Sequence, residues 1–350
     1  MRRPSACGFG TRLKGCLVTQ QHKKAQTESA TRPQGEPESG LSPSPTGRTT
    51  KILRFLSSIK TMRRMGPDEE RYVAPPRPYE LPTYRAGMKF CTSKEKYLRP
   101  RHYTDPRDQN VIALAHELGA FELSDREYAE AAYWWMKANT RWEVTRWYSA
   151  GQTLAEGAGT CWHLNSTYAA LCRCAEIKSR FKAFDTRMFE YGAQRLSLVD
   201  STVGNPLARE TLLPEAEVEV FIDGQWITAY VAQPSYLTAG AGWPVTEFGE
   251  SGIGLYFDEV PESVRFIESV PLKMIYPLSL MNLLAPATIE RLNVKMKTVQ
   301  ARGQLFIENA GGVEAYNQQA RKRRAHLTPN QILAQMSAER RRAEQAKAQT

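Results

Sequence analysis

The stretch GAGTCWHLNSTYAALCRCAEI, residues 157–177, places a cysteine where its thiol can act as a nucleophile. Gly157 and Gly159 allow a sharp approach of the backbone, and Thr160 suits the position just before a helix. Cys161 then falls in the first helical turn. There the free backbone N–H groups and the helix dipole favour an anion, which lowers the pKa of a thiol. We therefore predict Cys161 as a candidate nucleophile.

The helix behind Cys161 should pack on a core, because apolar residues recur along one of its faces. These residues are Leu164, Tyr168, Leu171, Cys172 and Ala175. Cys172 lies about 16 Å along the helix from Cys161 at 1.5 Å per residue. We predict that Cys172 is a packed small hydrophobe rather than a redox partner, and that Cys174 is also inert.

Composition is that of an ordinary globular protein, since 41% of the 350 residues are hydrophobic and 24% are charged. Six cysteines in so long a chain do not make a disulfide scaffold. No CxxC pair occurs and the chain has five histidines, which makes a zinc site a weak interpretation. We expect no metal and no cofactor.

A β-hairpin is predicted for EVEVFIDGQWITAYV, residues 217–231, where valine and isoleucine alternate with glutamate and phenylalanine. Asp223 and Gly224 supply a two-residue turn. With that turn, Glu217 faces Tyr230 across the ladder, and Glu215 is a diagonal neighbour on the same face.

The remaining pattern gives the fold class. Helical periodicity marks residues 105–119 and 124–142, and the second of these helices opens with a capping box formed by Ser124 and Glu127. Helices, a buried helix and then antiparallel strands indicate an α+β fold. From Pro277 the pattern is helical again. We expect four parts: a disordered basic tail with a short amphipathic segment (1–65), an extended approach segment (66–104), the main domain (105–275), and a helical C-terminal extension with a basic tail (276–350).

This layout resembles the transglutaminase-like branch of the papain-like cysteine enzymes, over roughly residues 105–272. The resemblance is carried by WEVTRWYSAGQTLAEGAGTCWHLNSTYAALCRCAEI, which includes Gly-Thr-Cys-Trp, and by EAEVEVFIDGQWITAY some fifty residues later. It implies a papain-like core in which the nucleophile helix packs on an antiparallel sheet. It also implies a nucleophilic thiol at Cys161, a histidine at the head of the first hairpin strand and an aspartate on the second strand. Such a set transfers acyl groups from amides through a thioester.

The chain departs from that pattern at both partner positions. Glu215 stands at the position of the histidine, Glu217 at that of an aromatic residue, and Tyr230 at that of the aspartate. We therefore predict Cys161, Glu215 and Tyr230 as the residues at the catalytic positions. Trp162, Glu217 and Glu219 are predicted to contact a substrate.

No other histidine completes the set. None occurs between His163 and His326, and His326 lies in the basic tail. His163 is about 200° round the helix from Cys161, so it cannot reach the sulfur. His116 lies on an early helix, and its use as the base would invert the family's chain order.

The ordinary pKa values disfavour thioester chemistry. A carboxylate of pKa about 4.3 facing a thiol of about 8.5 is mismatched by about four pH units, or roughly 5.7 kcal/mol. A negative Glu215 would also raise the pKa of Cys161. The leading hypothesis is a catalytically degenerate domain whose former thiol cleft binds a peptide or protein. The alternative is an active cysteine-dependent amidohydrolase, peptidase or acyltransferase that forms a thioester on Cys161.

The acidic edge formed by Glu215, Glu217 and Glu219 has three interpretations. The plainest is a row of carboxylates on the solvent-facing side of a strand. A sharper one is an acidic cleft beside Cys161 that recognises a cationic or amide-bearing ligand. The third, a site for a divalent metal, lacks further ligands in suitable spacing.

The basic charge is concentrated at the two ends. The formal net charge is +10, with +10 on residues 1–65, +6 on residues 316–350 and −6 on the remainder. Residues 51–65 form a basic amphipathic segment. A third hypothesis is therefore an adaptor that binds nucleic acid or an anionic membrane surface through these ends. The oligomeric state is not indicated by the sequence.

We expect a cytoplasmic protein, because no run of about 18 apolar residues occurs and the start lacks the apolar core of a secretory signal. The Arg-rich, acid-poor start is also typical of organelle import segments, and that alternative stays open at this point.

Overall fold

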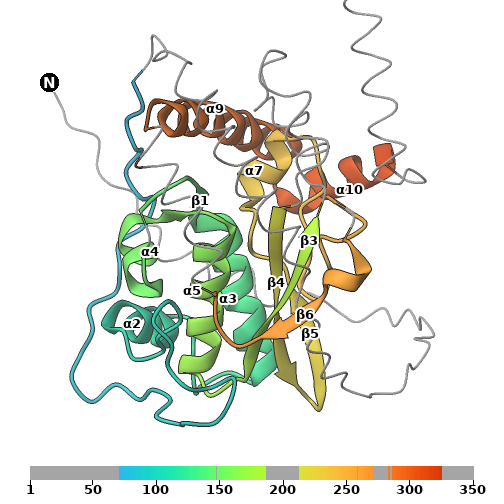
Figure 1. Ribbon diagram of the computed structural model, residues 1–350. Coiled ribbons are helices and arrows are strands. Elements are labelled where there is room, and N and C mark those ends of the chain that lie inside the picture. The colour runs from blue at the N-terminus through green and yellow to red at the C-terminus, as the bar shows by residue number, and fades with distance from the viewer. Residues whose placement is uncertain are drawn as a thin grey trace, which may run out of the picture. The chain divides into compact units, whose positions relative to one another are not determined.

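The helix that begins at Cys161 occupies the centre of the fold in the computed structural model (Figure 1). This helix, α5 (Cys161–Cys174), is buried at every residue except Cys161, which is partly exposed. The predicted apolar face is therefore confirmed, but the opposite face is covered too. Arg173 shows how a charge is accommodated there, because its guanidinium donates to the backbone carbonyls of Ser179 (2.8 Å) and Glu268 (2.7 Å).

The chain divides into two compact units, Met1–Arg48 and Thr49–Thr350, and every element below lies in the second. The structure describes residues 71–146, 148–186, 213–257, 259–271, 283 and 286–324. The predicted basic tail, the amphipathic segment and the C-terminal basic tail beyond residue 324 lie outside these ranges.

Three helices pack around α5 and are set by local capping signals. They are α2 (Gln109–Glu117), α3 (Asp125–Asn139) and α4 (Ala150–Glu156). The capping box of Ser124 and Glu127 starts α3, as predicted. Gly157 takes a left-handed conformation (φ 66°) and ends α4. The short strand β2 (Ala158–Gly159) then leads the chain into α5 and pairs in parallel with β1 (Arg141–Trp142), which precedes α4.

An antiparallel sheet packs against α5, with strand order β5-β4-β3-β6. Its strands are β3 (Ser179–Thr186), β4 (Leu213–Ile222), β5 (Gln225–Ala229) and β6 (Arg265–Ile267). The turn residues Asp223 (φ 52°) and Gly224 (φ 77°) are both left-handed, as a two-residue hairpin turn requires. Val218 pairs with Ala229, and the same register sets Glu217 opposite Tyr230, as predicted.

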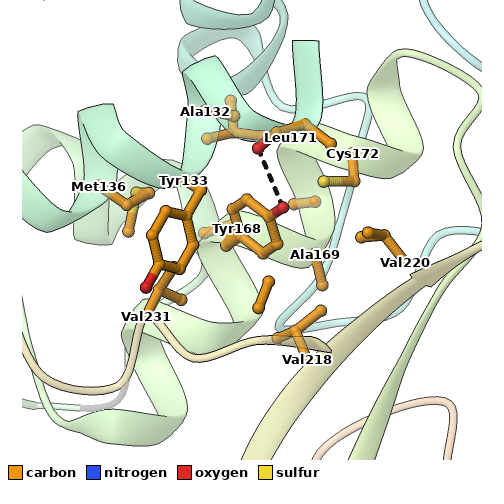
Figure 2. Packing of buried hydrophobic residues seen from close by; sticks show 14 of the residues in the cluster. Ala132, Tyr133, Met136, Tyr168, Ala169, Leu171, Cys172, Val218, Val220 and Val231 are labelled. Atoms are coloured by element: carbon orange, nitrogen blue, oxygen red, sulfur yellow. Dashed lines mark hydrogen bonds between the residues drawn. The ribbon is translucent and has the colours of Figure 1, made fainter. Parts of the chain in front are cut away.

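The core joins α3, α5 and one face of the sheet. Figure 2 shows Tyr168 and Cys172 of α5 between Met136 of α3 and the strand residues Val218 and Val220. Cys172 is fully buried, and burial raises the pKa of its thiol to about 12. The prediction that Cys172 is a packed small hydrophobe is confirmed.

Among the described residues, three further helices follow the hairpin: α7 (Ser235–Gly240), α9 (Pro286–Ala310) and α10 (Val313–Arg324). A short 3-10 turn, η2 (Pro261–Ser263), precedes β6. The helices α7 and α9 cross closely at glycines, because a Cβ atom on Gly303 would lie 1.8 Å from the backbone oxygen of Tyr236.

The fold is α+β with helices at the C-terminal side, as expected. Residues 71–104 hold no helix or regular strand. Within the described residues, no helix combines the length and apolar character needed to cross a membrane.

Gly303→Ala is expected to destabilise the protein by about 1–3 kcal/mol, because the added methyl group meets backbone rather than a movable side chain. Gln304→Ala, at the next and exposed position of α9, should stay within about 0.5 kcal/mol of the wild type. Urea unfolding followed by circular dichroism measures both. Equal midpoints for the two variants would contradict the close crossing of α7 and α9.

Candidate functional site

Cys161 is the first residue of α5, directly after the N-cap residue Thr160, so the predicted placement of the thiol is confirmed. It packs against two buried clusters at once, one around α5 and one that contains Tyr230 and Trp243. The thiol therefore lies at the junction of the helix, the hairpin and the C-terminal segments.

Glu215 is the side chain next to the thiol. It lies near the start of β4, is 2% exposed, and its carboxyl group is close enough to the Cys161 thiol for each group to shift the pKa of the other. One carboxyl oxygen, Oε1, also accepts from the backbone N–H of Ala216 at 2.9 Å. The predicted neighbourhood of Cys161 and Glu215 is thus present in the structure.

Burial sets the protonation of this pair. It raises the pKa of Glu215 to about 7, although the hydrogen bonds from Ala216 and Cys161 act in the opposite direction. The pKa of Cys161 is raised well above its ordinary value, first by burial and then by the charge of Glu215. The backbone N–H of Trp162 lowers it, as expected at a helix start, but this contribution is outweighed. The expectation of a lowered thiol pKa is therefore wrong, because desolvation exceeds the effect of the helix terminus.

Tyr230 is fully buried and joins the same group. Burial is the first cause of its raised pKa, and the nearby charges of Glu215 and Cys161 follow. Its hydroxyl has no hydrogen-bond partner within the described residues. The structure thus brings Cys161, Glu215 and Tyr230 close together, and their catalytic role stays a prediction.

Glu217 lies across the ladder from Tyr230 and is also fully buried. Its Oε1 accepts from the hydroxyl of Ser251 and from the backbone N–H of Gly252, each at 2.6 Å. Its Oε2 has no partner in the described part of the chain. Burial raises the pKa of this carboxyl group above its ordinary value.

Glu219 completes the acidic edge and is 8% exposed, so the interpretation of this edge as a solvent-facing row is wrong. Its carboxylate pairs with Arg180 of β3 at 2.7 Å. The guanidinium of Arg180 also lies over the rings of Trp226 and Phe266, at 4.0 and 3.9 Å from their centroids. The carboxylates of the edge therefore have separate protein partners, and no group of three metal-ligating side chains occurs among the described residues.

Trp162 follows Cys161 but is only 2% exposed, and its ring packs near Phe181 of the sheet at 6.4 Å between centroids. It has the position of a core residue. Its contact with a substrate stays a prediction, as do those of Glu217 and Glu219.

Two of the histidines considered from the sequence, His163 and His116, have backbone hydrogen-bond partners, and His326 lies outside the described residues. In His163, Nδ1 lies 3.1 Å from the backbone N of Thr160, which donates to it. Burial lowers the pKa of His163 to about 4. The Nε2 atom of His116 lies 2.8 Å from the backbone oxygen of Lys89. His102, the third histidine of the described residues, packs edge-on against Tyr103.

Lys137 is a residue of this region that sequence reasoning missed. It is fully buried on α3, and its Nζ donates to the backbone oxygens of Gln233 (2.6 Å) and Tyr230 (3.4 Å) and to Thr246 Oγ1 (3.1 Å). Burial lowers its pKa to about 7. The available signal was its place four residues after the buried Tyr133, which continues the inward face of α3.

Residues 112–231 match the model of the transglutaminase-like superfamily, a segment that contains α5, the hairpin and all three residues of the central group. A crystal structure of a proposed cysteine protease from Cytophaga hutchinsonii is similar at 24% identity, with a TM-score of 0.28. That similarity covers 39% of this chain and 40% of the other, less than half the length of either. At this TM-score the likeness carries no conclusion.

A comparison with curated proteins found no match. The matched segment contains the thiol at the start of α5, the carboxyl group on β4 and the phenol after β5, and residues 112–231 are a transglutaminase-like domain.

Proposed function

We propose that this transglutaminase-like domain is catalytically degenerate and that the site beside Cys161 binds a peptide or protein ligand. The observation that carries the proposal is the buried carboxyl group of Glu215 next to the Cys161 thiol, at the position where the family pattern has the histidine.

Proton transfer within this pair is unfavourable. The pKa of Cys161 is raised well above its ordinary value and that of Glu215 lies near 7, so the proton stays on the sulfur rather than moving to the carboxyl group. A Cys–His pair also gains from the attraction between thiolate and imidazolium after transfer. A thiolate beside a protonated carboxyl group has no such partner, and a second proton loss sets two negative charges side by side.

Unpaired polar atoms support ligand binding at the same place. The hydroxyl of Tyr230 and Oε2 of Glu217 are buried without protein partners, on residues that face each other across the hairpin. Buried polar groups are rarely left in this state, because each loses its hydrogen bonds to water. An amide group supplies one donor and one acceptor and can complete both. This complementarity favours an amide-bearing ligand.

One observation favours the alternative of an active thiol enzyme. A carboxyl group with a pKa near 7 is a better match to neutral pH than an ordinary glutamate, whose pKa is about 4.3. Glu215 would then accept the proton as Cys161 attacks an amide carbon, and return it to the leaving amine.

Alkylation of Cys161 by iodoacetamide tests the degenerate site. The rate should be very low at pH 6 and should still rise about tenfold per pH unit above pH 8, since the thiolate fraction limits it. Glu215→Gln should increase the rate above pH 8, because the adjacent negative charge is removed. Peptide mapping by mass spectrometry assigns the label. As a matched control, Glu219→Gln should not change the rate, since Glu219 pairs with Arg180.

Rapid and stoichiometric labelling of wild-type Cys161 at pH 6, with the other thiols unmodified, would refute the proposal. That result requires a thiolate at acid pH, which the buried pair with Glu215 does not allow.

The stability of the protein should depend on pH through Glu215. Its pKa is about 7 in the folded protein and about 4.5 in the unfolded chain, so the folded state binds more protons between these values. Its contribution to stability is complete below pH 4.5 and is lost as pH rises to 7. The stability of Glu215→Gln relative to wild type should therefore increase by about 3 kcal/mol over this range. Urea unfolding at pH 4.5, 6 and 7.5 measures the difference, and a constant difference contradicts the raised pKa.

Turnover of p-nitrophenyl acetate separates the two candidate functions. For a degenerate site, wild type and Cys161→Ala should release nitrophenolate at the same rate per mole of protein. A wild-type rate at least tenfold higher, with an acetyl group trapped on Cys161 and unchanged thermal unfolding of the variant, supports the active enzyme instead.

A further inference from the structure

The edge of β1 next to the site is paired with a helix instead of a strand. On one side of this segment, the N–H groups of Arg141 and Glu143 donate to the carbonyls of Gly157 and Gly159 of β2, each at 3.0 Å. In an extended segment the intervening residues direct their backbone groups to the other side. That side carries Trp142 and Val144, the residues that face α9.

Two side-chain amides of α9 satisfy this edge. Gln300 accepts from the N–H of Trp142 (2.8 Å) and donates to its carbonyl (3.1 Å). Asn293 does the same for Val144, at 2.9 and 3.0 Å. Each amide thus repeats the pair of bonds that a residue of a neighbouring antiparallel strand would make. Gln300 and Asn293 are seven residues apart, which puts them on one face of the helix.

The residues between these amides belong to the same buried cluster as Tyr230 of the site. Met296 and Val299 of α9 are buried in the cluster that contains Tyr230. Trp142 and Cys161 pack against the same cluster. Figure 1 shows α9 running across the end of the fold where β1 and the start of β4 lie. This helix lies outside residues 112–231, the segment that matches the family.

We propose that α9 is a built-in occupant of the ligand site, which holds the edge of β1 and covers the region of Cys161 until a ligand displaces it. This inference rests on the proposed function, because it describes how that site is closed in the free protein. A displacing ligand must supply two donors and two acceptors to Trp142 and Val144. An extended polypeptide does this with its backbone, which narrows the ligand class to peptides or exposed protein strands.

The attachment of α9 to α7 gives the displacement a fixed pivot. Arg302 donates through Nε and Nη2 to the carbonyl of Gly240, at 2.9 and 2.6 Å. These bonds and the close contact at Gly303 lie beyond Gln300 along α9, and Gly240 packs on the backbone of Val299, where an added Cβ atom would lie 1.9 Å from the Val299 oxygen. The part of α9 that contains Asn293 and Met296 can therefore loosen first, while the part from Val299 to Gly303 stays attached.

Loss of the two amides tests this cover in the full-length protein. Asn293→Leu/Gln300→Leu should increase labelling of Cys161 by biotin-maleimide at pH 8.5 at least tenfold. Amide hydrogen exchange of Trp142 and Val144 should accelerate by at least as much. The matched control is Gln304→Leu/Asn309→Leu, the same two changes at exposed positions of the same helix, which should alter neither rate.

Three outcomes overturn the proposal. Labelling that stays at the wild-type rate while Trp142 and Val144 exchange faster shows that α9 holds the strand without covering the thiol. Equal effects of the two double variants show a general response of the helix. Unchanged exchange of Trp142 and Val144 shows that the amides do not protect the edge.

Wild-type protein in low urea provides the same test if the double variant does not fold. Exchange of Trp142 and Val144 and labelling of Cys161 should then report one shared opening that requires less urea than exchange of the β4 amides. Exchange of all these groups only on global unfolding overturns the proposal. Rapid alkylation of wild-type Cys161 at pH 6 would instead reject the inert thiol, while the ratio between the two double variants remains a valid test of α9.

Discussion

The pairing of the Cys161 thiol with the buried carboxyl group of Glu215 is the interaction on which the site depends. Both groups are acids, and burial raises the pKa of each, so the stable state at neutral pH is a thiol beside a carboxyl group that is close to half protonated. The backbone N–H groups at the helix start lower the pKa of Cys161, but the effect of burial on the thiol is larger. Geometry typical of a nucleophile is therefore kept, while the electrostatics favour a neutral sulfur.

The sheet accommodates its acidic face by giving each carboxylate a different partner. One face of β4 carries Val218 and Val220 against α5, so the glutamates must lie on the other face, which is also covered. Glu219 is compensated by Arg180, and Glu217 accepts two hydrogen bonds from Ser251 and Gly252. Glu215, near the start of the strand, has the thiol instead of a cation. A cation that could stabilise a thiolate is thus absent beside Glu215, whereas Arg180 supplies one beside Glu219 further along the same strand.

Local signals predicted the parts of the fold that local chemistry determines. Thr160 and the glycines before it start the nucleophile helix, and Asp223–Gly224 fixes the hairpin register that sets Glu217 opposite Tyr230. Burial of the acidic edge was not predictable, because its partners come from residues 251–252 and from β3 across the sheet. The same applies to Lys137, whose acceptors are backbone oxygens about one hundred positions away. The prediction of a lowered pKa for Cys161 was wrong for a related reason, because desolvation depends on what the whole fold packs around the sulfur.

Lys137 and Glu215 show that desolvation outweighs pairing throughout this region. Their pKa values move in opposite directions and both come to about 7, one lowered for a base and one raised for an acid. An ion pair between them would raise the pKa of Lys137 and lower that of Glu215. The two pKa values shift in the reverse directions, so neither side chain serves the other as a counter-ion. The lysine instead donates to neutral oxygens, one of them the backbone oxygen of Tyr230. A ligand that enters beside Tyr230 therefore meets a site with low net charge and unmet hydrogen bonds, which selects for polar uncharged groups such as backbone amides over strongly charged ones.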